Sequence, residues 1–541
     1  MIKKPFLTKA VLFDFDGTLT KPGAIDFAVI KNALGCPVDA PILEYIAALP
    51  DPHQRENAYA ALHTFEAEAA EQSMPNDDAE SLLAHIRTLG IPVGLISRNS
   101  LDAIKSSLHN FRDTALGDFD VVITRDDPIE PKPSPEGILR AAERLGINAD
   151  QIIVVGDYIF DMQAGRRAGA VTVLLETVLP VDMPEIDFDF KVARLDDVKE
   201  IIQLGLPLPQ GKLPNSLLDR FLEHLFIKDS ALLIAPGVGE DTAATDISED
   251  EVLVLKSDPI TFATDAVGQY AVLVNANDIA TSGAKPRWFM TTLLFPPGST
   301  GSSIWLTMDE LNRVASKYDI TLCGGHTEIT DAVTRPVVIG SLVGTVTRKN
   351  LIDKSSMRPG DKVLMTKAVA VEGTAIIARE FEGRLKALNV SDEQIQSSRQ
   401  LLDHVSIMEE AKLAVNIGGV SAMHDVTEGG LATALFELSA AGGYGISVDM
   451  DAIPVFPQTK HICRLLDISP LGLIGSGTLL ICCHPGQSME MMDALLKAGI
   501  RATCIGEVLD QKAGITAHTH DGPQTWPTFE VDEIARLFHD H

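Results

Sequence analysis

The chain has 541 residues, which at about 150 residues per domain predicts about three to four domains. Hydrophobic residues make up 45% and charged residues 22%, as in ordinary globular proteins. A formal net charge of -30 repels phosphate backbones and anionic lipid, and only 5% of the residues are aromatic, so binding to nucleic acid or to a membrane is not expected.

The cysteines and the N-terminus point to an intracellular chain. Six cysteines without CxxC spacing predict neither a disulfide framework nor a zinc site. The first residues hold no apolar stretch of the length of a secretory signal, and no uncharged run approaches the ~20 residues that cross a bilayer. We therefore expect a cytoplasmic protein.

Residues 1–205 alternate short apolar runs with helical stretches. The runs KAVLFDFD, PVGLIS, DVVIT, IIVVGD and VTVLL are separated by segments of helix length, which is typical of a parallel sheet covered on both faces. Residues 21–84 read as helices only and predict a small cap inserted after the first strand. A linker, LGLPLPQGK, ends this Rossmann-like α/β domain.

Polar residues stand where these strands are expected to end. Asp14 and Asp16 follow the first run, Ser97 the second, Lys132 the third, and Asp157 and Asp161 the fourth. The carboxyl ends of parallel strands share one edge, where open α/β sheets bind ligands. These residue types fit phosphoryl transfer.

A carboxylate such as Asp14 can attack phosphorus and form an aspartyl-phosphate, while Asp16 protonates the leaving group and then activates water. Ser97 and Lys132 would hold the phosphoryl oxygens. Asp14, the carbonyl of Asp16 and Asp157 would bind Mg²⁺. This set resembles the haloacid dehalogenase (HAD) superfamily over residues 8–200, and the cap resembles that of its phosphoglycolate-phosphatase-like members. The resemblance implies a phosphatase acting on a small phosphorylated metabolite.

The second segment is predicted to contain two mixed α/β subdomains, 212–349 and 350–515, and a solvated tail, 516–541, with His518, His520, His539 and His541. Its candidate metal and phosphate ligands stand in glycine-flanked turns, where backbone N–H groups can approach phosphates and carboxylates can share Mg²⁺. They are Gly237, Gly239, Asp241, Asp258, Asn275, Asn277, Asp278, Asp425, Thr427, Gly429 and Gly430.

The order GVGED, SDP, NANDIATSGAKP, GGHTE and HDVTEGGLATAL resembles the ATP-binding family of aminoimidazole ribonucleotide (AIR) synthetase, selenophosphate synthetase, thiamine-monophosphate kinase and HypE, with the wording closest to HypE. This resemblance covers about residues 212–510. It implies a two-subdomain, PurM-like α/β fold, a homodimer formed by this half, ATP as ligand, and metal or phosphate contacts from Asp241, Asp258, Asp278 and Asp425.

The acceptor groups of that family are missing. HypE ends in a cysteine-bearing tail and selenophosphate synthetases carry a reactive cysteine in a glycine-rich loop, whereas the last cysteine here is Cys504 and GKLPNSLLDRF contains none. We therefore expect ATP-dependent activation of an acceptor that the sequence leaves unassigned.

The run CGGHTEIT adds Thr327 and Glu328 as candidate phosphate contacts. His326 between the glycines and these residues is either an acid or base beside the phosphates or a turn histidine bonded to backbone. Two functions stay open: a bifunctional phosphatase and ATP-dependent synthetase, or a phosphatase regulated by a nucleotide-sensing, dimerising C-terminal module.

Overall fold

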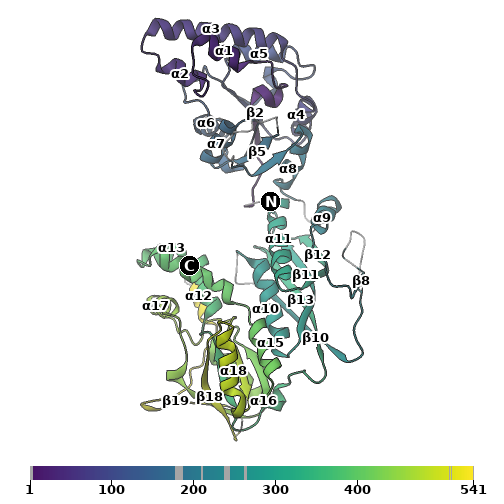
Figure 1. Ribbon diagram of the computed structural model, residues 1–541, viewed down its shortest axis with the longest axis vertical. Coiled ribbons are helices and arrows are strands. Elements are labelled where there is room, and N and C mark those ends of the chain that lie inside the picture. Colours follow the sequence, from purple (N-terminus) through teal and green to yellow (C-terminus); the bar gives the residue numbers. More distant parts are fainter. Residues whose placement is uncertain are drawn as a thin grey trace. The chain divides into compact units, whose positions relative to one another are not determined.

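The computed structural model describes residues 4–176, 187–208, 211–234, 236, 244–260, 265–510, 512 and 514–539. The chain separates into two compact units (Figure 1): the first comprises Met1–Pro209 and Gly298–Leu306, the second Gln210–Pro297 and Thr307–His541. Within the described ranges, no helix combines the length and the apolar composition that a membrane crossing requires.

The first unit contains one parallel sheet. Its strands are β1 (Ala10–Phe13), β2 (Val93–Ile96), β3 (Val121–Ile123), β4 (Ile152–Gly156), β5 (Val171–Leu175) and β6 (Phe190–Val192). Its helices are α1 (Phe27–Leu34), α2 (Ile42–Ala48), α3 (Pro52–Gln72), α4 (Ala79–Thr88), α5 (Leu101–Leu108), α6 (Glu136–Leu145), α7 (Ile159–Ala168) and α8 (Val198–Leu204).

The strand order is β3-β2-β1-β4-β5-β6, and the printed pairs are all parallel. The chain moves outward in one direction from β1 and in the other from β4, so the topological switch point lies between these two strands. Both strands are fully buried, as their continuous apolar runs predict. The expected Rossmann-like α/β fold is confirmed.

Helices α1, α2 and α3, which lie together in Figure 1, are inserted between β1 and β2. They have their own small core. Ile30, Ile46 and Leu62 are among the buried members of this core. Helix α4 instead contacts β2 and α8 of the sheet layer. The cap is therefore shorter than the predicted range 21–84, because the last predicted helix covers the sheet.

The second unit contains two larger sheets and one two-stranded ribbon. Its strands are β7 (Gly211–Lys212), β8 (Leu232–Ile234), β9 (Ala244–Thr245), β10 (Glu251–Ile260), β11 (Lys285–Phe295), β12 (Thr321–Ile329), β13 (Val337–Thr347), β14 (Lys362–Thr366), β15 (Val420–Asp425), β16 (Gly445–Asp449), β17 (Leu479–Cys483), β18 (Ala502–Leu509), β19 (Gly514–Thr519) and β20 (Gly522–Gln524). Its helices, with α11 shared between the units, are α9 (Asn215–Leu222), α10 (Val267–Thr281), α11 (Gly301–Lys317), α12 (Val371–Glu380), α13 (Glu382–Ala387), α14 (Asp392–Arg399), α15 (Met408–Ile417), α16 (Gly430–Gly442), α17 (Pro457–Leu466), α18 (Pro485–Lys497) and α19 (Glu533–His539).

The first of these sheets has the order β10-β13-β11-β12-β7, the second β15-β17-β14-β18-β16-β19-β20, and β8 pairs with β9. Helix α10 packs against β10, β11 and β13 and buries Tyr270 and Ile279. The opposite side of this sheet is apolar at its edge, since Leu253 and Leu255 on β10 are 44% and 71% exposed and Met290 on β11 is 40% exposed.

The predicted solvated tail is wrong for most of its length. β19 pairs with β16 and β20 with β19, so the second sheet continues to Gln524. Ile534 and Leu537 of α19 are buried. The prediction relied on the histidines. His518 and His520 are exposed, but they alternate with apolar or small residues in and directly after β19, so this segment is folded.

Candidate active site

The loop after β1 carries Asp14 and Asp16 to the carboxyl edge of the first sheet. The backbone N–H of Asp14 donates to the carbonyl of Val155 on β4 at 2.9 Å, which holds Asp14 at the switch point. The chain then turns at Gly17, where φ is +76° and an added Cβ would lie 2.3 Å from Oδ2 of Asp157. Glycine is required here because Asp157 approaches the backbone of the turn.

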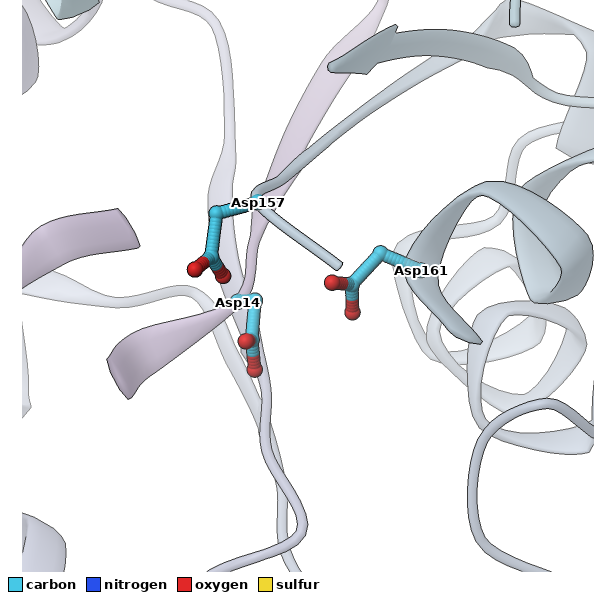
Figure 2. A group of neighbouring side chains, drawn as sticks. All are labelled: Asp14, Asp157 and Asp161. Atoms are coloured by element: carbon cyan, nitrogen blue, oxygen red, sulfur yellow. The ribbon is translucent and has the colours of Figure 1, made fainter. Parts of the chain in front are cut away.

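Three carboxylates face one space at this edge (Figure 2): Asp14 after β1, Asp157 after β4 and Asp161 in the first turn of α7. One oxygen of each lies within 4.8 Å of the others. Lys132 is 7% exposed, and its Nζ donates to Oδ1 of Asp14 at 2.5 Å, to Oδ1 of Asp161 at 2.6 Å and to the carbonyl of Ile96 at 2.9 Å. The fold thus brings together residues that lie far apart in the sequence.

The charges of this cluster do not balance. Burial, together with the charges of Asp14 and Asp161, raises the pKa of Asp157 to about 8. Burial opposes the charged form of Lys132, but Asp14 and Asp161 outweigh this effect and raise its pKa. Three carboxylates around one ammonium leave a surplus of negative charge, and clustered carboxylate oxygens are the ligands of hard divalent cations. The residues therefore fit Mg²⁺.

Asp16 lies beside this cluster and has different surroundings. Burial raises the pKa of its carboxyl to about 7, and the charges of Asp14 and Glu66 act in the same direction. The side-chain amide of Asn99 donates to Oδ2 of Asp16. A carboxyl pKa near neutrality suits a group that must release and accept a proton at that pH.

Ser97, the first residue after β2, is 7% exposed, and its Oγ accepts the backbone N–H of Asn99 at 3.2 Å. Ser97, Asp16 and Lys132 line one cavity of about 350 Å³, together with the three clustered carboxylates and residues of the cap. All the N-terminal site residues predicted from the sequence therefore border a single cavity.

Two further residues of this site, Thr18 and Asn99, were not predicted as site residues, whereas Asp161 was expected at this edge. Thr18 donates its hydroxyl to Oδ1 of Asp157 at 3.2 Å, Asn99 contacts Asp16, and Asp161 contacts Lys132. The sequence gives no clue to Thr18 and Asn99, because each lies in a turn after its strand, so strand alternation does not place its side chain.

In the second unit, Nζ of Lys256 lies 3.0 Å from Oδ2 of Asp258 and 3.0 Å from Oδ2 of Asp278. Asp425 is 2% exposed, and burial and the charge of Asp278 raise its pKa. The predicted carboxylates are brought together, but Lys256 bridges two of them, and in the described ranges the only group with three close ligand oxygens is the one in the first unit. The role of these side chains as metal ligands stays a prediction. The predicted Gly237, Gly239 and Asp241 lie outside the described residues.

Asn275 and Asn277 have structural roles instead of the predicted contacts with phosphate. Asn275 donates to the carbonyl of Ala271 at 2.9 Å and accepts the backbone N–H of Asp258 at 3.0 Å. Asn277 donates to the carbonyl of Val405 at 2.8 Å and accepts an N–H from the same loop. Both side chains are completely buried, so their amides join α10 to neighbouring backbone.

The turn before α16 also differs from the prediction. The backbone N–H of Gly429, predicted to face phosphate, donates to Oδ2 of Asp532 at 2.7 Å. Gly429 and Gly430 are buried with φ of 77° and 64°, and the carbonyl of Thr427 accepts the N–H of Gly430 at 3.1 Å. A carboxylate of the chain itself thus occupies the predicted anion position.

Glu328 lies on the other side of its sheet from Asp258. The register places Asp258, Gly340, Thr291 and Gly325 in one row. Side chains alternate along a strand, so Thr327 shares the side of Asp258, whereas Glu328 lies on the opposite side with His326, whose Nε2 is 3.4 Å from Oε2 of Glu328. Glu328 therefore does not share the side of Asp258, and its contact with phosphate stays a prediction.

A doubly wound sheet with this Asp–Lys–Asp cluster at its switch point defines the class of HAD-type hydrolases. Residues 8–169 match the haloacid dehalogenase-like hydrolase family. Residues 239–346 and 358–518 match the N-terminal and C-terminal domains of the AIR synthase related proteins. The chain belongs to both families and is an enzyme in which a HAD hydrolase precedes an AIR synthase-related, HypE-like part.

Individual relatives agree with this division. The chain is 31% identical over 198 residues to an uncharacterised hydrolase of Saccharomyces cerevisiae, covering 36% of this chain and 90% of that protein. It is 30% identical over 285 residues to the carbamoyl dehydratase HypE of Cupriavidus necator, covering 50% of this chain and 77% of that protein. The crystal structure of Escherichia coli HypE has the same fold, with a TM-score of 0.51 and 22% identity over 60% of this chain and 98% of that one.

Proposed function

We propose that the protein is bifunctional. The first unit hydrolyses phosphomonoesters of small metabolites with Mg²⁺, and the second uses ATP to phosphorylate or activate an acceptor that is not assigned. The observation that carries the phosphatase proposal is the cluster of Asp14, Lys132, Asp157 and Asp161 with Asp16 beside it, all on one cavity.

In the first half-reaction, a carboxylate oxygen of Asp14 attacks phosphorus. The Asp14–phosphorus bond forms as the bond from phosphorus to the alcohol oxygen breaks, and Asp16 gives its proton to that oxygen. In the second, Asp16 takes a proton from a water molecule whose oxygen attacks the same phosphorus. The aspartyl bond then breaks, which releases phosphate and restores Asp14.

Lys132 and Ser97 hold the phosphoryl oxygens in both steps. Asp14, Asp157 and the backbone carbonyl of Asp16 would bind Mg²⁺, with Asp161 holding Lys132 in place. A bound Mg²⁺ supplies positive charge against the phosphoryl oxygens. The surplus of carboxylates and the raised pKa of Asp157 support this assignment.

The test is Asp14→Asn in the full-length protein, because an amide cannot replace the nucleophile. Phosphate release from a panel of phosphomonoesters is expected to fall by at least about 1,000-fold. Asp102→Asn is the matched control, since Asp102 on α5 has a side chain 78% exposed and does not line the cavity. Retention of more than about a tenth of wild-type turnover would contradict the role of Asp14.

For the second unit, the proposal of ATP use rests on its membership of the AIR synthase-related family. Two contacts favour an alternative. Lys256 bridges Asp258 and Asp278, and Oδ2 of Asp532 accepts the backbone N–H of Gly429. In that case this half senses nucleotide and regulates the phosphatase. ATP consumption in the full-length protein separates the two, because a sensor changes the phosphatase rate without turning ATP over.

We also propose a homodimer through the second unit. The exposed leucines Leu253 and Leu255 on β10 and the exposed Met290 on the same side of β11 support this interface, because exposed apolar side chains on a sheet face are typical of association. With a net charge of -30 per chain, pairing requires a largely apolar contact.

A further inference from the structure

The cavity of the first unit extends from the phosphoryl site to the cap, and the cap side is apolar. Ile42, Leu43 and Leu62 line it and are themselves 9%, 8% and 4% exposed. Phe27, at the start of α1, also lines the cavity but leaves 57% of its surface exposed. An exposed phenyl ring beside a buried apolar wall is a surface that a ligand can cover.

The arginine nearest the phosphoryl site is already engaged. The guanidinium of Arg98 lies 2.6 Å from Oε2 of Glu44, donates to the carbonyl of Lys132 and stacks over the ring of Phe160 at 5.1 Å from its centroid. Because three partners hold it, Arg98 is not placed to receive a second anionic group of a substrate.

The two lysines on the cap side are also paired. Nζ of Lys31 donates to the carbonyl of Val38 at 2.5 Å, and Nζ of Lys21 lies 2.8 Å from Oδ1 of Asp77. Each ammonium is directed to a partner in the chain.

The acidic group on this side is neutralised as well. Glu66 on α3 is 5% exposed and is bound by both Nη atoms of Arg125, at 2.5 and 2.8 Å. Glu66 and Lys21 are therefore each paired with an opposite charge, the ammonium of Lys31 is directed to a backbone carbonyl, and most of the remaining lining on the cap side is apolar.

Resting on the proposed phosphatase function, we infer that the natural substrate is a phosphomonoester whose alcohol portion is uncharged and apolar, with a ring or a branched chain. A second carboxylate or phosphate on the alcohol would have to draw Lys31 or Arg98 away from its present partner or stay unpaired, and an unpaired buried charge is strongly unfavourable. The cavity volume of about 350 Å³ lies near the lower end of the range of about 300–1,000 Å³ for small-molecule sites, which suits one ring system.

The first test compares benzyl phosphate with 4-carboxybenzyl phosphate on the full-length protein with Mg²⁺. The two esters share the same reacting group and ring and differ in one carboxylate. We expect kcat/KM for benzyl phosphate to exceed that for the carboxylated ester by about ten-fold or more, and to exceed that for phosphoglycolate as well. Equal values, or a preference for either carboxylated ester, would overturn the inference.

The second test changes the wall of the cavity. Phe27→Ala is expected to lower kcat/KM for benzyl phosphate about ten-fold more than for ethyl phosphate, from loss of contact with about half a phenyl ring. Val29→Ala is the matched control, because Val29 lies on the same helix, is 52% exposed and does not line the cavity. The same change in the benzyl-to-ethyl ratio in both variants would overturn the inference.

A binding measurement separates this inference from the proposed function. Benzylphosphonate, which cannot be hydrolysed, is expected to bind more tightly than phosphonoacetate by calorimetry. If this order holds while no ester is turned over, the proposed phosphatase mechanism is refuted and the apolar character of the site is supported. If phosphonoacetate binds more tightly, the inference fails whether or not the protein is a phosphatase.

Discussion

Gly17→Ala is expected to lower kcat/KM for phosphomonoesters about 100-fold. An alanine Cβ at this position would lie 2.3 Å from Oδ2 of Asp157, whereas ordinary contacts begin at 3.4 Å, so the carboxylate must withdraw by about 1 Å. A displacement of about 1 Å in a catalytic group costs about 100-fold in rate. The left-handed backbone of Gly17 adds a stability cost of about 1–2 kcal/mol.

The control for this backbone cost is Gly169→Ala. Gly169 has φ +81°, close to the +76° of Gly17, and an added Cβ there meets nothing within 4 Å. Both variants should lose similar stability in thermal melts, but only Gly17→Ala should lose activity and require more Mg²⁺ for half-maximal rate. If the kcat/KM values of the two variants agree within about five-fold, the position of Asp157 does not govern catalysis.

Three other outcomes are expected. Without Mg²⁺, the free energy of unfolding should fall as the pH rises from about 4 to 8, because folded Asp157, with a pKa of about 8, keeps a proton that the unfolded chain has released. Calorimetry should therefore show that Mg²⁺ raises Tm more at pH 8 than at pH 5.5. The Asp157→Asn variant should show a smaller difference. Leu255→Glu should shift the protein from dimer to monomer in light scattering. Glu66→Gln leaves the guanidinium of Arg125 without its carboxylate and should cost about 3 kcal/mol in denaturant unfolding; an unchanged midpoint would show that the pair adds no stability.

Most of the first unit could be predicted because the apolar runs that form its strands are followed by the polar residues of its site. The apolar runs form the buried parallel strands, with β3 at the edge of the sheet, and the polar residues after them reach the same carboxyl edge of the sheet. Asp14, Ser97 and Asp157 follow directly from their positions after a strand, whereas Lys132 lies in the loop beyond β3. The contact of Asn99 with Asp16 could not be predicted, because it depends on how the loop after β2 folds.

The second unit was predictable in fold but less so in its site. An asparagine or a glycine in a turn can bind a ligand or form hydrogen bonds within the protein, and the sequence does not distinguish these two roles. Gly429 is bonded to Asp532, which stands more than a hundred residues later, and Lys256 is directed to Asp278 on another element. Such partners are set by packing over long separations. The alternation of strand β12, by contrast, already separates Glu328 from Thr327.

The position of β10 has a consequence for how the protein must be produced. This strand is at the edge of its sheet and carries Leu253 and Leu255 on its exposed side, and an edge strand with exposed apolar side chains is a usual site of aggregation. If the proposed homodimer covers this strand, slow expression at moderate temperature should give pairing time to compete with precipitation. The yield of soluble protein would then itself report on whether the second unit finds its partner.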